Sequence, residues 1–132
     1  MKRIYLFFIG LLVWGEILAQ QLVKVGDGYS STSVNTTVFR NSSLVTDGEV
    51  QYISYYDADG YLTVGKRTLG TTDWTLQRSQ YKGNVADAHN VISMMVDGDG
   101  YLHLSFDHHG NKLNYCKSTE PGALTLGEKE AM

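Results

Sequence analysis

The chain has 132 residues and a formal net charge of −3 at pH 7, with 42% hydrophobic and 19% charged residues. This composition is ordinary for a globular protein and excludes wholesale disorder. The mildly acidic balance, without a basic run, argues against nucleic acid as a partner. Fourteen glycines, nine tyrosines and a single proline favour short strands joined by tight turns. We therefore expect an all-β fold.

The N-terminal segment has the layout of a secretory signal peptide. Lys2 and Arg3 give it a positive start, residues 4–15 are an apolar run, and Ala19 suits the position before a cleavage site. The apolar run is too short for a membrane-spanning helix, which needs about twenty residues. We predict that residues 1–19 are removed on export and that no membrane attachment remains after cleavage.

The rest of the chain alternates β-rich runs with Asp/Gly turns. Residues 20–25 and 30–40 are strand candidates, and residues 47–60 align without gaps on residues 97–110, fifty positions later. A repeat near fifty residues with several strands in each copy is typical of a β-propeller blade. Two unrelated hairpins in a β-sandwich are the alternative explanation.

The second copy of this repeat contains a predicted β-hairpin. Its strands lie in the segment 91–106 and flank an Asp/Gly turn. A two-residue loop at 98–99 would place His89 opposite His108, one residue from His109. Imidazoles, carboxylates and carboxamides therefore meet at the open end of the hairpin, which we take as the candidate site.

These residues also have plainer interpretations. His89 and His109 could cap strand ends through satisfied hydrogen bonds, and His103 lies on the opposite strand face from its apolar neighbours. A zinc site that combines the histidines with Cys116 matches no compact ligand spacing. We predict no cofactor and no metal among the site residues, and we leave open a structural calcium or zinc ion elsewhere.

Four runs of the chain, residues 55–67, 87–90, 97–105 and 109–113, resemble the opening of BNR-repeat-containing family proteins. These are secreted seven-bladed β-propellers of polysaccharide-degrading bacteria, and they include ulvan lyases. The most specific parts are an Asp-x-His-Asn motif and a later His-Gly-Asn motif. The resemblance implies that residues 20–132 form about two blades of such a propeller, in a secreted or periplasmic protein.

In the ulvan-lyase branch, histidines of these two motifs line the substrate cleft. The role that this implies for His89 and His109 is catalysis. From their chemistry alone, Asn90 and Asn111 could bind sugar hydroxyls, and Asp87 or Asp107 could fix the tautomer of an imidazole. Imidazole can act as base or acid near neutral pH, and as a cation it can pair with a carboxylate. The implied substrate is an acidic polysaccharide of uronic acid and rhamnose, cleaved by β-elimination.

Two other functions fit the same residues. One is a glycoside hydrolase of the α-L-rhamnosidase type built on the same fold. The other is a propeller that binds carbohydrate without cleaving it. An unsaturated, ultraviolet-absorbing product would distinguish a lyase from both.

We expect the 132-residue chain alone not to cleave ulvan. Closing a propeller takes at least four blades, about 160 residues or more, and the resemblance places a catalytic Tyr and Arg in later blades. The chain is therefore expected to be the N-terminal part of a longer, truncated propeller. Incubation of the purified chain with ulvan should give no rise in ultraviolet absorbance, and steady product formation would contradict this expectation.

Overall fold

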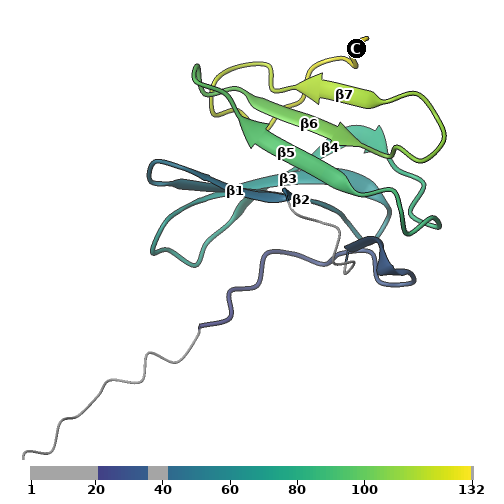
Figure 1. Ribbon diagram of the computed structural model, residues 1–132. Helices are drawn as coiled ribbons and strands as arrows, with labels where there is room; N and C mark the ends of the chain where they lie inside the picture. Colours follow the sequence, from purple (N-terminus) through teal and green to yellow (C-terminus); the bar gives the residue numbers. More distant parts are fainter. Residues whose placement is uncertain (1–20, 36–41, 132) are drawn as a thin grey trace, which may run out of the picture.

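The computed structural model describes residues 21–35 and 42–131, so the predicted signal peptide lies outside the described residues. Two antiparallel sheets are stacked on each other (Figure 1). The first sheet has the order β1-β2-β3-β4, with strands Leu44–Asp47, Val50–Tyr56, Tyr61–Thr68 and Thr75–Lys82. The second has the order β5-β6-β7, with strands Ile92–Val96, Leu102–Phe106 and Asn114–Lys117. The all-β prediction is confirmed.

Helix is almost absent from the described residues. A short 3-10 turn, η1 at Ser33–Asn35, precedes the first sheet. No helix in the described part of the chain is long and apolar enough to cross a membrane. The predicted strands at 20–25 and 30–40 are not seen at residues 21–25 and 30–35, which are irregular or belong to η1, and residues 36–40 of the second prediction lie outside the described residues.

One hydrophobic core lies between the two sheets. Burial alternates along the central strands, as expected for sheets with one face on the core. The first sheet contributes Tyr52, Tyr56, Leu62 and Val64, and the second contributes Ile92, Met94, Leu102, Leu104, Phe106 and Cys116. Each fully buried Leu, Ile or Phe side chain stabilises the fold by about 1.5–3 kcal/mol relative to an exposed one. Neither sheet buries its apolar face without the other.

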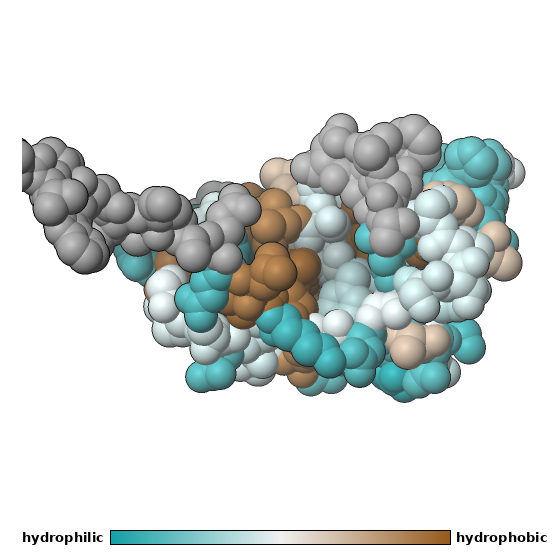
Figure 2. All heavy atoms as spheres, turned by 90° about the horizontal axis from the view of Figure 1, so that it is seen from below, coloured by the Kyte–Doolittle hydropathy of each residue, from teal (hydrophilic) through white to brown (hydrophobic). Residues whose placement is uncertain are grey.

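The outer faces of the sheets also carry apolar side chains. Leu44, Ile53 and Leu76 lie in one row across the first sheet, and Leu44 is 50% exposed. On the second sheet Met95 is 56% exposed. An apolar patch flanked by hydrophilic residues is visible from below (Figure 2). Such faces are typical of blade-like sheets, which pack against neighbours on both sides.

Two turns of the structure are built in the same way. In the β2–β3 turn, Oδ1 of Asp57 accepts hydrogen bonds from the backbone N–H groups of Asp59 and Tyr61, at 3.0 Å each. In the β5–β6 turn, Oδ1 of Asp97 accepts from Asp99 and Tyr101, at 3.0 and 2.9 Å.

Both turns end on a glycine in the left-handed region, Gly60 with φ 82° and Gly100 with φ 85°. A side chain is disfavoured in that conformation, which explains the glycine at both positions.

The equivalent turns correct the predicted repeat from fifty residues to forty. β2 and β3 correspond to β5 and β6, so that residues 57–62 and 97–102 occupy the same positions. Both segments read Asp-x-Asp-Gly-Tyr-Leu. The fifty-residue alignment matched the β1–β2 turn with the β5–β6 turn, which differ in length because Asp47 pairs with Val50 but Val96 with Leu102.

The hairpin register also differs from the prediction. Val96 pairs with Leu102 and Ile92 with Phe106, and the backbone N–H of Asp97 donates to the Tyr101 carbonyl at 3.0 Å. The loop therefore has three residues, a type I turn followed by a left-handed Gly100. The additional loop residue moves the pairing by one position compared with the two-residue loop expected from the sequence.

Loss of the Asp57 carboxylate is expected to destabilise the fold. Asp57 is 8% exposed and also pairs with Arg78 at 2.6 Å. Replacing it by Ala leaves two backbone donors of the turn without their acceptor, at a cost of about 1–3 kcal/mol for each that stays buried. Asp59→Ala is the matched control, because it removes an exposed ion pair to the same Arg78 and should cost under about 1 kcal/mol. Urea unfolding of both variants measures the difference, and equal losses would contradict this account of the turn.

Candidate functional site

The candidate residues lie in two loops at one end of the second sheet. Residues 83–91 join β4 to β5, and residues 107–113 join β6 to β7. Ile92 pairs with Phe106. Three residues before Ile92 and three residues after Phe106, the same register brings His89 opposite His109. Their ring centroids are 4.3 Å apart with planes inclined by 32°. The structure thus brings the two predicted catalytic histidines together, and the partner of His89 is His109 instead of His108.

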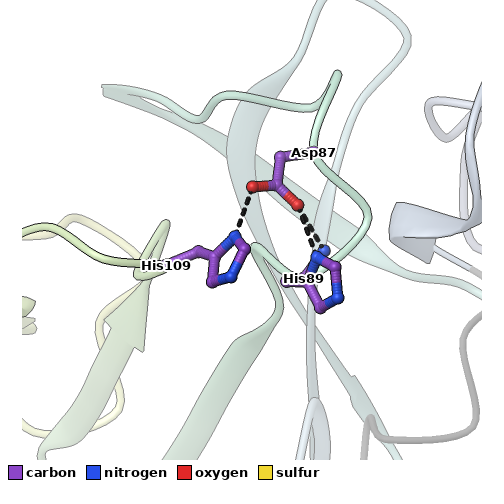
Figure 3. A group of neighbouring side chains, drawn as sticks. All are labelled: Asp87, His89 and His109. Carbon is purple, nitrogen blue, oxygen red and sulfur yellow. Dashed lines mark hydrogen bonds and ion pairs between the residues drawn. The ribbon is translucent and has the colours of Figure 1, made fainter.

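Asp87 lies between the two imidazoles (Figure 3). Nδ1 of His89 is 2.8 Å from Oδ1 of the carboxylate, and Nδ1 of His109 is 2.6 Å from Oδ2. The backbone N–H of His89 also donates to Oδ1, at 2.9 Å. One carboxylate therefore binds its own loop through Oδ1 and the other loop through Oδ2.

The electrostatics of the cluster follow from these bonds. Hydrogen bonds from the His109 ring, then from the backbone and ring of His89, hold the pKa of Asp87 well below its usual range. The carboxylate is therefore ionised at neutral pH. The side chains of His89 and His109 are 63% and 52% exposed, against 29% for Asp87. Solvent and ligands thus have access to the rings, while the carboxylate lies beneath them.

Asp107 holds the two loops together without touching a ring. It is the one described non-glycine residue with a left-handed backbone, at φ 50°, a conformation that Asp tolerates better than most residues. Its Oδ1 accepts from the backbone N–H of Asn84 at 2.6 Å. Of the two carboxylates predicted to support an imidazole, Asp87 contacts both rings, whereas Asp107 contacts the backbone of the other loop.

The two asparagines stabilise the loops in this structure. Asn90 is 4% exposed, and its Nδ2 donates to the Asn84 carbonyl at 3.0 Å. Asn111 is exposed; its Oδ1 accepts from the His109 backbone N–H, and its Nδ2 donates to the Asp107 carbonyl. Their role in binding sugar hydroxyls stays a prediction, to which the exposed Asn111 is better suited than the buried Asn90.

The other histidines lie outside the cluster. His103 donates or accepts at both nitrogens, with Nε2 2.8 Å from Oδ2 of Asp97 and Nδ1 2.7 Å from the Tyr115 hydroxyl. Its predicted structural role is confirmed by these contacts. His108 is exposed beside Asp107. A hollow of about 340 Å³ lies on the outer face of the second sheet, and it is lined by residues such as Met95 and Tyr115 instead of the His89–His109 pair.

A metal site can be weighed against hydrogen bonding at the cluster. One donor atom from each of Asp87, His89 and His109 lies within 4.8 Å of the others, and a carboxylate with two imidazoles is a set that zinc accepts. Two ligands of a tetrahedral zinc, each about 2.0 Å from the ion, are about 3.3 Å apart. The nitrogen–oxygen distances of 2.6 and 2.8 Å are instead those of charge-assisted hydrogen bonds.

Cys116 does not contribute to such a site. It is fully buried on β7, and burial raises the pKa of its thiol to about 11. The metal site considered from the sequence, which combined Cys116 with the histidines, therefore lacks its thiolate.

One contributor was missed by sequence reasoning. The backbone of Asn84 donates to Asp107 and accepts from the Asn90 side chain and the Asp87 N–H. Because these contacts are made by main-chain atoms, the identity of residue 84 carries no signal of them.

Asp87 is expected to make stability depend on pH. A carboxylate whose pKa is lowered by folding stabilises the protein above its unfolded pKa of about 3.9, and this contribution is lost as pH falls through the folded value. Asp87→Asn lacks the titrating group. The difference in unfolding free energy between the wild type and this variant that comes from this carboxylate should be fully present above about pH 5 and should shrink as the pH falls below about 4. Urea unfolding at several pH values tests this, and a difference that stays constant on acidification would contradict it.

Comparison with known proteins places this geometry in a family. A profile of the BNR repeat-containing family matches residues 50–132, which include both loops of the site. No curated protein matches the chain.

Two solved structures resemble the fold. One is described as a polysaccharide lyase of family PL25, an ulvan lyase (TM-score 0.57, 17% identity, covering 68% of this chain and 26% of that one). The other is described as a PL25 ulvan lyase bound to -[GlcA(1-4)Rha3S]-. Its TM-score is 0.61 at 15% identity, and the match covers 81% of this chain and 28% of that one.

The chain thus spans about a quarter of the length of these two structures. At 15–17% sequence identity, the structural similarity shows a shared fold and nothing more. It identifies the two stacked sheets as a β-propeller fragment. Since the family profile covers more than half of the residues, the chain belongs to the BNR repeat-containing family.

Proposed function

We propose that the chain is part of an exported propeller enzyme that cleaves an acidic polysaccharide of uronic acid and rhamnose by β-elimination. The observation that carries the proposal is the pair of exposed imidazoles, 4.3 Å apart, with Asp87 beneath both. It is supported by the fold, which resembles an ulvan lyase bound to a glucuronate and sulfated rhamnose oligosaccharide. The proposed location is the bacterial periplasm or the exterior.

β-Elimination requires one group that removes a proton and one that donates a proton, and the two imidazoles can fill these roles. A base removes the proton at C5 of the uronate, the freed electron pair forms the C4–C5 double bond, and the bond from C4 to the glycosidic oxygen breaks. The departing oxygen then takes up a proton. A neutral imidazole suits the first task and a protonated one suits the last. His89 and His109 are the proposed catalytic residues, and Asn111, with the more buried Asn90, is proposed to bind sugar hydroxyls.

The substrate carboxylate also needs a positive partner. No Lys or Arg among the described residues forms an ion pair with Asp87 or hydrogen-bonds either ring. In this site the cation would be a protonated imidazole, or a group from another part of the propeller. No cofactor is required for the elimination itself.

The carboxylates favour a lyase over a glycoside hydrolase. The common mechanism of glycoside hydrolysis uses two carboxyl groups, one of which must be protonated to act as a general acid. Asp87 is ionised and bonded to both rings, and Asp107 is engaged by the Asn84 backbone. Asp87 is therefore not suited to donate a proton, and Asp107 already accepts a hydrogen bond, so the rhamnosidase alternative is less well supported by this part of the chain. A binding propeller without catalysis uses the same residues and is decided by the assay.

Binding of the oligosaccharide is expected to depend on the two histidines. We would titrate the chain with a glucuronate and 3-sulfated rhamnose oligosaccharide and follow the backbone amide signals by NMR. The double variant His89→Gln, His109→Gln should weaken binding at least tenfold, the equivalent of about 1.4 kcal/mol. His108→Gln is the matched control, since His108 is exposed in the same loop but outside the cluster.

Equal affinity for wild type and double variant would sink the assignment of this site. A loss of affinity shared by His108→Gln would point to a general charge effect in the loop. Turnover is tested separately in a longer propeller that contains this segment: unsaturated product indicates a lyase, saturated fragments indicate a hydrolase, and tight binding without either indicates a binding protein.

A further inference from the structure

We propose that Asp87 is a positioning residue that sets the same tautomer in both histidines, so that both ring nitrogens offered to a ligand are proton acceptors. The proposal takes its functional meaning from the lyase function proposed above. Its physical content, the position of two protons, can be tested without any polysaccharide.

The Asp87 carboxylate decides where the protons of the two rings lie. An ionised carboxylate has lone pairs and no proton, so each group that hydrogen-bonds to it must donate. Oδ1 faces Nδ1 of His89 at 2.8 Å, and Oδ2 faces Nδ1 of His109 at 2.6 Å. Each neutral ring must therefore carry its proton on Nδ1. The remaining nitrogens, Nε2 of both rings, then hold lone pairs and point away from Asp87 (Figure 3).

A second histidine in the same sheet has the opposite arrangement. Nε2 of His103 faces Oδ2 of Asp97 at 2.8 Å, while its Nδ1 lies 2.7 Å from the Tyr115 hydroxyl. The same reasoning assigns the proton of His103 to Nε2. His103 is thus an internal reference for the other tautomer, set by another carboxylate.

The two oxygens of Asp87 are not equivalent. Oδ1 accepts from the backbone N–H of His89 as well as from its ring, whereas Oδ2 accepts from the His109 ring. In Asp87→Asn, the amide oxygen is expected to remain where two donors converge. The NH₂ group then takes the place of Oδ2 and donates to Nδ1 of His109. This reverses the tautomer of His109 and leaves His89 unchanged.

The consequence for chemistry concerns the direction of proton transfer. With both Nε2 atoms unprotonated, the neutral site accepts hydrogen bonds from sugar hydroxyls or takes the C5 proton. In the variant, one of the two exposed nitrogens becomes a donor. A single carboxylate thus leaves the Nε2 atoms of two adjacent imidazoles as hydrogen-bond acceptors, whereas an amide makes one an acceptor and the other a donor.

The test is a nitrogen-15 NMR measurement of the imidazole rings in the free 132-residue chain. At about pH 8.5, two units above the reference imidazole pKa of about 6.5, the ring nitrogen without a proton resonates far downfield of the protonated one. We expect Nδ1–H for His89 and His109 and Nε2–H for His103. In Asp87→Asn, only His109 should change to Nε2–H. Single His→Gln variants assign the signals.

Asp107→Asn is the matched control, because the Asp107 carboxylate contacts a backbone N–H and no ring. In this variant His89 and His109 should both keep the Nδ1–H tautomer. An Nε2–H tautomer for His89 or His109 in the wild type would overturn the proposal, as would an unchanged His109 in Asp87→Asn. A change in the wild-type spectrum on adding EDTA would also overturn it, by indicating a metal in place of the two protons. If Asp87→Asn loses the native amide spectrum, the wild-type tautomers alone decide. Failure of oligosaccharide binding leaves this result intact and counts only against the proposed function.

Discussion

The geometry of the site depends on the turn between β5 and β6. The Asp97 carboxylate accepts hydrogen bonds from two backbone N–H groups of the turn and so stabilises a three-residue loop. The loop length sets the strand register, and the register decides which residues face each other beyond the ends of the strands. A turn shorter by one residue would oppose His89 to His108 and would exchange the buried and exposed faces of β6. The turn, the core and the His89–His109 pair are thus consequences of one local structure.

The shared core explains why the two sheets occur together. Leu62 and Val64 from one sheet, and Leu102 and Leu104 from the other, belong to one buried cluster. The loops of the site join strands of these sheets, and their ends are therefore held by the same core. Rigid strands with polar loops at one end are a common way to support a functional site. Here the support extends to the loops themselves, because Asp107 ties one loop to the backbone of the other.

The site concentrates its charge on a single carboxylate. The hydrogen bonds that lower the pKa of Asp87 also orient both rings, so ionisation and ring geometry have one cause. This arrangement suits histidines that exchange protons with a ligand, and it makes Asp87 a poor proton donor. It also separates the cluster from the Asp97–His103–Tyr115 group, in which both ring nitrogens of the histidine are already engaged inside the chain.

The all-β class, the hairpin at 91–106 and the gathering of histidines at its open end could be predicted from the sequence, because alternation, turn residues and antiparallel pairing are local properties. The predicted register, however, placed His89 opposite His108 instead of His109. The resemblance of the two motifs to the BNR-repeat-containing family identified the family before the fold was known. The forty-residue repeat was also readable, since Asp-x-Asp-Gly-Tyr-Leu occurs at 57–62 and 97–102, but the fifty-residue match was longer and misleading.

Other features were decided only by the tertiary structure. Whether Asp87 or Asp107 reaches the rings depends on how two loops, more than fifteen residues apart, are placed by the packed sheets, and the sequence left both open. The burial of Asn90 and the backbone contacts of Asn84 likewise arise from loop–loop packing. Sequence patterns determine which residues alternate and turn; the distance between two loops is determined by the core that holds their strands, because every contact across it is non-local.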